Sequence, residues 1–382
     1  MEYTPPERIR DIKPFLVMDI LERARQLEAA GRRVIHLEVG EPDFDTPGVI
    51  VRAAQQALSD GHTHYTTALG IPELREAIAD HYNSRYGISI PPSRVVVTSG
   101  TSPAMLMLFS TILEAGDEVI ISNPHYACYP SFILSAGGIP TLVPAGADEG
   151  FVLQVDKIRG RMTSRTRGVL INSPSNPTGS RLLKAEIAAL TELDLPIISD
   201  EIYHGLSYGG HDHTALEFSD EAFVINGFSK YFAMTGWRLG YLIVPERYVR
   251  TLEILQQNYF VSPNPFVQLG GVAALREGIP DAEKMREIYD ERRKVMVEGL
   301  KRIGLPVHRE PDGAFYAFAD AHPFGADSLD LAKEILEATG VAIAPGADFG
   351  PGGEGYLRFS YCNSVENIET ALSEVGKYLA AR

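Results

Sequence analysis

Short apolar runs alternate with amphipathic segments through the middle of the chain. The runs are rich in valine and isoleucine and lie at residues 95–97, 119–121, 169–171, 197–198 and 223–225. Strands that are apolar on both faces are typical of a buried parallel sheet, and the spacing between the runs suits crossover helices. From about residue 94 the pattern therefore predicts an α/β domain.

Two flanking regions lack this alternation of apolar runs and amphipathic segments. Residues 18–27 have a helical pattern that stops at Gly31, and residues 281–302 form a charged amphipathic segment followed by mixed helix and strand signals. A chain of 382 residues is too long for one hydrophobic core. We expect a large domain and a small, discontinuous α+β domain, at 41–275 and at 1–40 with 276–382.

Composition narrows the class of protein. A net charge of −15 argues against nucleic acid or an anionic membrane as the main partner. The start of the chain lacks a basic region followed by an apolar stretch, and no apolar run is long enough to span a bilayer. The only cysteines, Cys128 and Cys362, lie far apart in the sequence, which argues against a disulfide framework or a structural zinc site. We expect a cytoplasmic protein without a metal, although residues 211–213 (His-Asp-His) have metal-like composition.

Polar residues follow several of the apolar runs. Open α/β sheets bind ligands at the carboxyl ends of their strands, so these residues predict a site. Taken singly, each has an ordinary explanation. Lys230 would be a solvated surface charge, Asp200 a helix cap, residues 173–179 a rigid proline turn, and Thr101 or Ser102 a helix N-cap.

Together these segments occur in a specific order. The motifs are SPSNPTG at 173–179, DEIY at 200–203, and a lysine at 230 followed eight residues later by an arginine. With Val39–Phe44 and Tyr356–Tyr361, they resemble the class I/II aminotransferases, pyridoxal-phosphate enzymes of fold type I, over nearly the whole chain. The resemblance implies a mostly parallel seven-stranded sheet flanked by helices, and a ping-pong exchange of an amino group between an L-amino acid and a 2-oxo acid.

The resemblance also assigns roles around the cofactor ring. Lys230 is implied to bind pyridoxal phosphate covalently and to move the substrate proton, which requires a lowered amine pKa. Asp200 matches the acid that pairs with the pyridine nitrogen. Asn176 and Tyr203 match the residues that hydrogen-bond the ring's 3′-oxygen, and Tyr126 matches the aromatic that stacks on the ring.

Other residues match the phosphate site. Arg238 corresponds to the phosphate arginine, and the backbone N–H groups of Thr101 and Ser102 add donors at a helix start, with Ser229 as a weaker candidate. Tyr65 resembles the tyrosine that reaches the phosphate of a neighbouring subunit, which implies a homodimer. The alternative for Tyr65 is local packing within its own loop.

Arg358 matches the arginine that binds the substrate α-carboxylate, assisted by the Gly40 N–H, Asn176 and Phe15. Without the family context, an outward-pointing Arg358 would be the expectation. Some bacterial aspartate-specific relatives carry lysine at the position that aligns with Ser102. Its absence, and an apolar mouth formed by Phe15, Val17 and Tyr126, favour alanine, aromatic or other neutral amino acids, with glutamate left open as a shared donor.

Three alternatives differ in class. A pyridoxal-phosphate-dependent C–S β-lyase would use the same lysine, aspartate and arginine, because the cofactor supplies the electron sink in both reactions. A non-catalytic pyridoxal-phosphate-sensing module would need a DNA-binding segment and a different charge balance. A nicotinamide dehydrogenase would need a G-x-G-x-x-G motif after the first strand, which residues 100–103 do not supply.

Overall fold

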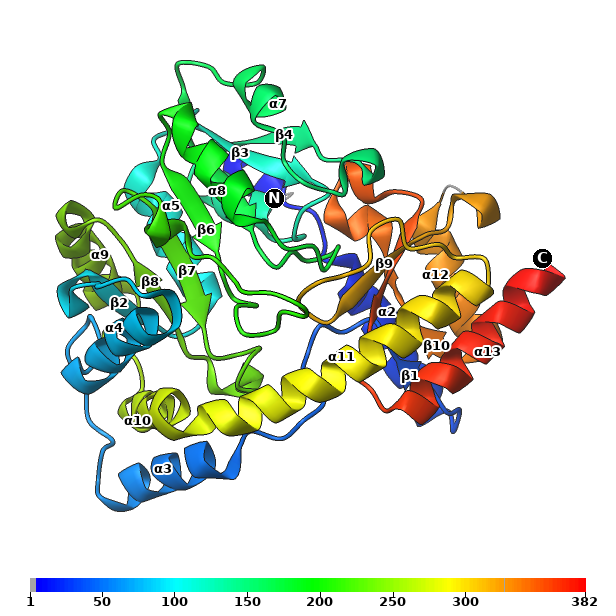
Figure 1. Ribbon diagram of the computed structural model, residues 1–382, viewed down its shortest axis with the longest axis horizontal. Helices are drawn as coiled ribbons and strands as arrows, with labels where there is room; N and C mark the ends of the chain where they lie inside the picture. Colours follow the sequence, from blue (N-terminus) through cyan, green and yellow to red (C-terminus); the bar gives the residue numbers. More distant parts are fainter. Residues whose placement is uncertain (1–4, 326) are drawn as a thin grey trace, which may run out of the picture.

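The computed structural model describes residues 5–325 and 327–382 (Figure 1). The helices are α1 (Glu7–Arg10), α2 (Leu16–Ala29), α3 (Gly48–Ser59), α4 (Pro72–Tyr86), α5 (Thr101–Ile112), α6 (Tyr129–Ser135), α7 (Val155–Arg159), α8 (Lys184–Leu190), α9 (Glu246–Tyr259), α10 (Pro265–Ala273), α11 (Ile279–Arg302), α12 (Ser328–Thr339) and α13 (Val365–Ala381). The strands are β1 (Ile35–His36), β2 (Val95–Thr98), β3 (Glu118–Asn123), β4 (Ile139–Pro144), β5 (Thr166–Asn172), β6 (Ile197–Asp200), β7 (Phe223–Gly227), β8 (Gly240–Ile243), β9 (Tyr316–Asp320), β10 (Val341–Ala342), β11 (Ala344–Pro345) and β12 (Tyr356–Ser360).

A mixed seven-stranded sheet has the order β2-β8-β7-β6-β5-β3-β4. Strands β3 to β7 pair in parallel, whereas β8 is antiparallel to both β2 and β7. The five predicted strands are confirmed. The mostly parallel seven-stranded sheet is also confirmed, with β2 joined to it through the reversed strand β8.

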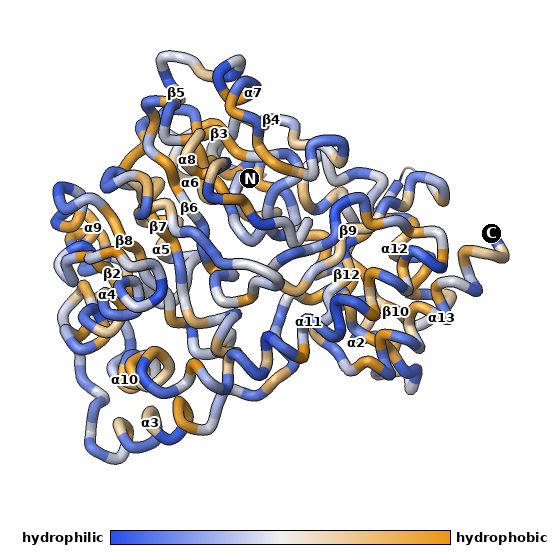
Figure 2. Tube along the Cα trace, in the orientation of Figure 1, coloured by the Kyte–Doolittle hydropathy of each residue, from blue (hydrophilic) through white to orange (hydrophobic). Residues whose placement is uncertain are grey.

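Both faces of this sheet are buried. Val96, Ile121 and Ile198 contribute to an apolar cluster that includes residues of α5, α6 and α9, while their strand neighbours Val97 and Ile120 belong to the other large cluster. Successive side chains of a strand point to opposite faces, so a continuous apolar run satisfies both clusters. In Figure 2 the central strands are correspondingly orange, whereas α11 alternates between polar and apolar positions.

The ends of the chain meet in a second group of elements. Strand β1 pairs in parallel with β10, strands β11, β12 and β9 form an antiparallel sheet, and α2 packs against α12, β10 and β11. A continuous helical run through α10, a π-helical turn at Ala274–Gly278 and α11 connects the two groups (Figure 1). The predicted domain boundary at 275/276 falls inside this run, and the division at that residue stays a prediction.

Among the described residues, no helix is both long and apolar enough to cross a membrane.

Candidate active site

The carboxyl ends of β5 and β6 are tied together by one asparagine. Asn172, the last residue of β5, donates from its side-chain amide to the backbone oxygen of Asp200 at 2.9 Å and accepts from the N–H of Asn176 at 2.8 Å. These bonds hold the proline turn at 173–179 beside the end of β6. The structure therefore brings Asn176 and Asp200 to the sheet edge where the sequence predicts a site.

Asp200 is a buried acid at this edge, with only 3% of its surface exposed. One carboxylate oxygen accepts from the Tyr129 hydroxyl at 2.7 Å, and the other accepts from the Ile202 N–H at 3.2 Å. Burial raises the pKa of Asp200 to about 6, and the Tyr129 hydroxyl acts against this rise. The contact with the Ile202 N–H resembles the predicted capping role. The contact with the buried Tyr129 hydroxyl does not belong to a helix cap.

Tyr129 is a site residue that the sequence interpretation missed. It lies three residues after Tyr126, and the two rings are 5.3 Å apart between centroids. Tyr126 precedes α6, and its carbonyl accepts from the Tyr129 N–H at 3.1 Å, so no helical spacing in the sequence marks Tyr129 as a site residue.

Lys230 lies in the loop after β7 and is half-buried. Its Nζ donates to the Gly40 carbonyl at 2.6 Å. Burial lowers the pKa of this amine to about 8, and the positive charges of Arg358 and Arg238 act in the same direction. A solvated surface lysine is excluded by this geometry. An amine with a pKa near 8 is roughly one-fifth neutral at physiological pH, a far larger neutral fraction than that of a free lysine.

Arg358 is almost completely buried, with 2% of its surface exposed, so the outward-pointing alternative is wrong. Its Nη1 donates to Asn176 Oδ1 at 2.9 Å, and its Nη2 donates to the backbone oxygen of Glu38. The Tyr316 ring centroid lies 4.4 Å from its Cζ. Both hydrogen bonds go to neutral oxygens, and Nε has no partner among the described residues. A buried guanidinium in this state favours an external anion.

Gly40 and two tyrosines complete this end of the site. A Cβ at residue 40 would lie 1.9 Å from the Tyr316 hydroxyl, so the close approach requires glycine. The Tyr316 hydroxyl is hydrogen-bonded to that of Tyr203 at 2.8 Å. Tyr316 and the carbonyl of Glu38 are further residues that the sequence interpretation missed.

The start of α5 forms the opposite end of the site. Its N-cap residue is Gly100, with φ +98° and no side-chain cap, so the predicted alternative of a capping Thr101 or Ser102 side chain is wrong. The guanidinium of Arg238 lies over Gly100, where a Cβ would be 2.6 Å from Nη2. A bare helix N-terminus beside an exposed arginine is suited to a phosphate group.

The remaining predicted residues are spread around this cleft. Phe15 contacts Tyr126 edge to face at 6.4 Å between centroids, and Ser229 is buried. Tyr65 is 83% exposed, which contradicts the alternative that it packs locally. Asp348, which was not predicted, accepts hydrogen bonds from the Leu16 and Val17 N–H groups at 2.8 and 3.0 Å and so fixes the start of α2 next to Phe15.

Side chains of the His-Asp-His segment make contacts within the chain. Asp212 accepts from the Gly205 N–H at 2.9 Å and from Arg85 at 3.0 Å, while His213 contacts Glu217. Within the described ranges, no group of three or more histidine, cysteine, aspartate or glutamate side chains is arranged to hold a metal ion.

Comparison with known proteins agrees with this geometry. Residues 32–375 match the family "Aminotransferase class I and II". The chain is 39% identical to a (5-formylfuran-3-yl)methyl phosphate transaminase of Methanocaldococcus jannaschii, over 98% of this chain and 99% of that protein, and 37% identical to the aspartate/prephenate aminotransferase of Thermus thermophilus, over 97% and 98%.

Solved structures give the same result. A Mycobacterium tuberculosis aminotransferase superposes with a TM-score of 0.94 at 37% identity and covers both chains completely. The Thermus thermophilus aspartate aminotransferase with maleate has a TM-score of 0.93 at 36% identity, covering 98% of this chain and 100% of that one. The predicted resemblance and fold class are therefore confirmed: this chain belongs to the class I and II aminotransferase family and is an aminotransferase.

Proposed function

We propose that this aminotransferase uses pyridoxal phosphate to exchange an amino group between a neutral L-amino acid and a 2-oxo acid. The observation that carries the proposal is Arg358, a buried guanidinium whose hydrogen bonds go only to neutral oxygens and whose Nε is unpartnered among the described residues. A carboxylate is the anion that a planar guanidinium binds with two parallel hydrogen bonds. Both substrates of a transaminase carry one.

The residues present fit pyridoxal phosphate. Asp200 is a buried acid for the pyridine nitrogen, and Lys230 is an amine with a pKa near 8 for covalent attachment. Arg238 and the N–H groups of Thr101 and Ser102 would hold the phosphate, with Ser229 nearby. When bound, the cofactor supplies an electron sink for the bonding electrons of the substrate Cα.

The other side chains would orient the reacting groups. Asn176 and Tyr203 are proposed to bind the ring's 3′-oxygen, and Tyr126 to stack on the ring. Arg358, with the Gly40 N–H, would fix the substrate carboxylate, so that the Cα–H bond faces Lys230. The neutral Lys230 amine would then accept the Cα proton as a general base.

The substrate side chain would meet an apolar surface. Val17, Phe318 and Phe349 form a buried cluster to which Phe15 adds, and the Phe349 ring lies 4.9 Å from the Arg358 guanidinium. Ser102 is exposed and uncharged. These features support alanine, aromatic or other neutral donors. A panel of amino donors ranked by kcat/KM tests this, and a clear preference for aspartate over every neutral donor would contradict it.

A second copy of the chain would complete the phosphate end. Tyr65, Tyr259 and Val261 are 83%, 54% and 47% exposed, and the Thr66 N–H donates to Ser262 Oγ at 3.2 Å, which joins their two segments. Val261 has φ +67°, a strained backbone for a β-branched residue. An exposed apolar patch with local strain supports a homodimer in which Tyr65 reaches the partner's cofactor.

A single-turnover experiment tests the reaction. The protein loaded with pyridoxal phosphate is mixed with an amino acid and no acceptor. We expect one equivalent of 2-oxo acid per protomer, no ammonia, and continued turnover only after a second 2-oxo acid is added. With a cysteine thioether as the amino acid, sustained release of a thiol, pyruvate and ammonia would instead establish the C–S lyase alternative, which nothing among the described residues favours.

A further inference from the structure

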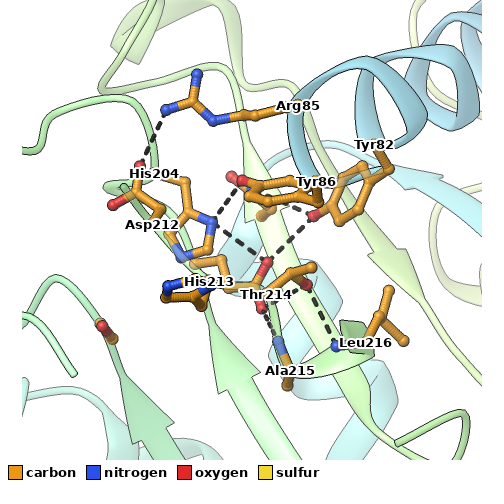
Figure 3. A network of polar contacts seen from close by, with 12 residues as sticks. Tyr82, Arg85, Tyr86, His204, Asp212, His213, Thr214, Ala215 and Leu216 are labelled. Carbon is orange, nitrogen blue, oxygen red and sulfur yellow. Dashed lines mark hydrogen bonds and ion pairs between the residues drawn. The ribbon is translucent and has the colours of Figure 1, made fainter. Parts of the chain in front are cut away.

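A buried polar cluster lies directly behind the proposed cofactor acid, Asp200. Figure 3 shows it between α4, which contributes Tyr82, Arg85 and Tyr86, and the segment that carries His204 and Thr214. At its centre is Glu201, the residue after Asp200, whose surface is completely buried. The proposed mechanism does not use this carboxylate.

Glu201 is held by several donors. One of its oxygens accepts from Thr214 Oγ1 at 2.9 Å and from the Ala215 N–H at 3.0 Å, and the other accepts from the Tyr82 hydroxyl at 3.3 Å. Its own N–H donates to the Ile225 oxygen of the neighbouring strand at 2.8 Å. Both polar atoms of the peptide group between Asp200 and Glu201 are therefore held, because its oxygen accepts from the Asn172 side chain and its N–H donates to Ile225.

The hydrogen bonds explain an acceptor at residue 201 but not a negative charge. A glutamine oxygen could accept from Thr214 and Ala215 equally well, without the desolvation cost of an ion. Burial raises the pKa of Glu201, and the charge of Glu201 in turn raises the pKa of Asp200. Two adjacent buried acids are unfavourable for the protein alone, which suggests that a positive charge from outside offsets them.

The Glu201 carboxylate has one ion-pair partner among the described residues, His204, which carries a charge only when its ring is protonated. The Arg85 guanidinium pairs with Asp212 at 3.0 Å. His204 Nδ1 lies 3.5 Å from Glu201, yet it lies only 2.7 Å from the Tyr86 hydroxyl. While the His204 ring is neutral, the charge of Glu201 acts on the neighbouring Asp200 side chain.

The same helix also contacts the loop of the cofactor lysine. The Arg85 guanidinium lies 5.8 Å from the ring centroid of Tyr231, the residue after Lys230, and Tyr82 is hydrogen-bonded at 3.4 Å by Asn226 of β7. Helix α4 therefore braces both segments that carry the proposed cofactor residues.

We propose that Glu201 is a positioning residue whose buried negative charge, acting through Asp200, favours the protonated pyridine nitrogen of the cofactor. The proposal rests on the proposed function, since it presumes that Asp200 faces that nitrogen. A protonated ring is the stronger electron sink, so Glu201 acts on rate rather than on substrate affinity.

The test compares Glu201→Gln with Glu217→Gln, both loaded with pyridoxal phosphate carrying ¹⁵N in the ring. Glu217 is the matched control because it accepts from the Thr214 N–H in the same turn, at 3.1 Å. We expect the ring-nitrogen shift of Glu201→Gln to move toward the unprotonated value, and its single-turnover rate to fall roughly tenfold with an unchanged half-saturating amino acid concentration. Glu217→Gln should match the wild type in all three, and Glu201→Asp, which keeps the charge, should restore the protonated signal.

An unmoved ring-nitrogen shift in Glu201→Gln, or an equal change in Glu217→Gln, would overturn the proposal. If Glu201→Gln does not fold, Thr214→Val decides, because it removes a hydroxyl that donates to the Glu201 carboxylate and so disfavours the charged form. The proposal predicts a ring-nitrogen shift that moves part of the way toward the unprotonated value in that variant, and an unmoved shift would overturn it. Failure of the wild-type protein to bind the cofactor would instead count against the proposed function.

Discussion

The two arginines at the ends of the site are built in opposite ways. Arg358 is 2% exposed, packs on the rings of Tyr316 and Phe349, and is oriented by oxygens of its own chain. Arg238 is exposed, has φ +54°, and borders a cavity of about 750 Å³ lined also by Glu41, Trp237 and Phe266. The proposed carboxylate end is thus built within one chain, whereas the proposed phosphate end is open. Under the proposed function, this difference predicts that substrate selection is intrinsic to the protomer and that cofactor retention depends on dimer formation.

Replacing Arg358 by glutamine should have the largest effect. Two charge-assisted hydrogen bonds to the substrate would be lost at a buried position, so we expect kcat/KM to fall roughly 100- to 1,000-fold with cofactor affinity nearly unchanged. Steady-state kinetics and a cofactor titration measure the two quantities. Arg358→Lys should recover only part of the loss, because an ammonium cannot form the planar fork. If kcat/KM and cofactor affinity fell equally, Arg358 would not differ from Arg238 in the way proposed here.

The converse variant, Arg238→Gln, should act on the other end. We expect the dissociation constant of pyridoxal phosphate to rise roughly 10- to 100-fold, because one of several phosphate donors is removed from an exposed site. At saturating cofactor, the KM for the amino acid should change by less than about threefold. A large change in KM with normal cofactor affinity would show that Arg238 belongs to the substrate.

Tyr65→Phe tests whether the open end is completed by a partner. Loss of one hydroxyl contact to the phosphate should weaken cofactor binding by roughly tenfold or less. Tyr259→Phe, on the same exposed patch, is the matched control and should have no effect. Sedimentation should find dimers, and a fully active monomer would refute the role assigned to Tyr65.

The smallest expected effect is the pH-dependent contribution of His36 to the free energy of unfolding. His36 Nδ1 lies 2.7 Å from Glu38, and this contact, the largest cause, raises the pKa of His36 to about 9. A raised histidine pKa stabilises the fold fully below the ordinary value near 6.5, and the contribution is lost as pH rises through about 9. We expect His36→Gln to cost about 1 kcal/mol or less near pH 6, because the pair is partly screened by solvent.

Urea unfolding of the wild type and of His36→Gln across this range measures the difference. It should shrink toward zero above about pH 9. A difference that is constant with pH would mean that His36 contributes packing and not charge.

Sequence patterns predicted the five strands of the seven-stranded sheet that are apolar on both faces. They did not predict the other two strands of that sheet, β4 and β8. Strand β4 contains Pro140 and Pro144 and is half-exposed at the sheet edge, so it lacks the buried-strand signal. Strand β8 is short, begins at Gly240 and follows directly on the Arg238 loop. Its reversed direction depends on how that loop returns to the sheet, and no local pattern encodes this.

The same limit applies to the site. Asp200, Lys230 and Arg358 were predicted because their side chains occur in recognisable motifs. The carbonyls of Glu38 and Gly40 that orient Arg358 and Lys230 carry no side-chain signal, since every residue has a carbonyl. Tyr129 and Tyr316 reach the site only through tertiary packing, from α6 and β9.

The most direct test of the account is covalent trapping of the cofactor. The protein is incubated with pyridoxal phosphate, reduced with borohydride, digested, and its peptides are analysed by mass spectrometry. The account predicts one modified residue per protomer, Lys230, and no adduct in Lys230→Ala. An adduct on another lysine, or an unmodified Lys230 in protein that has bound the cofactor, would contradict it.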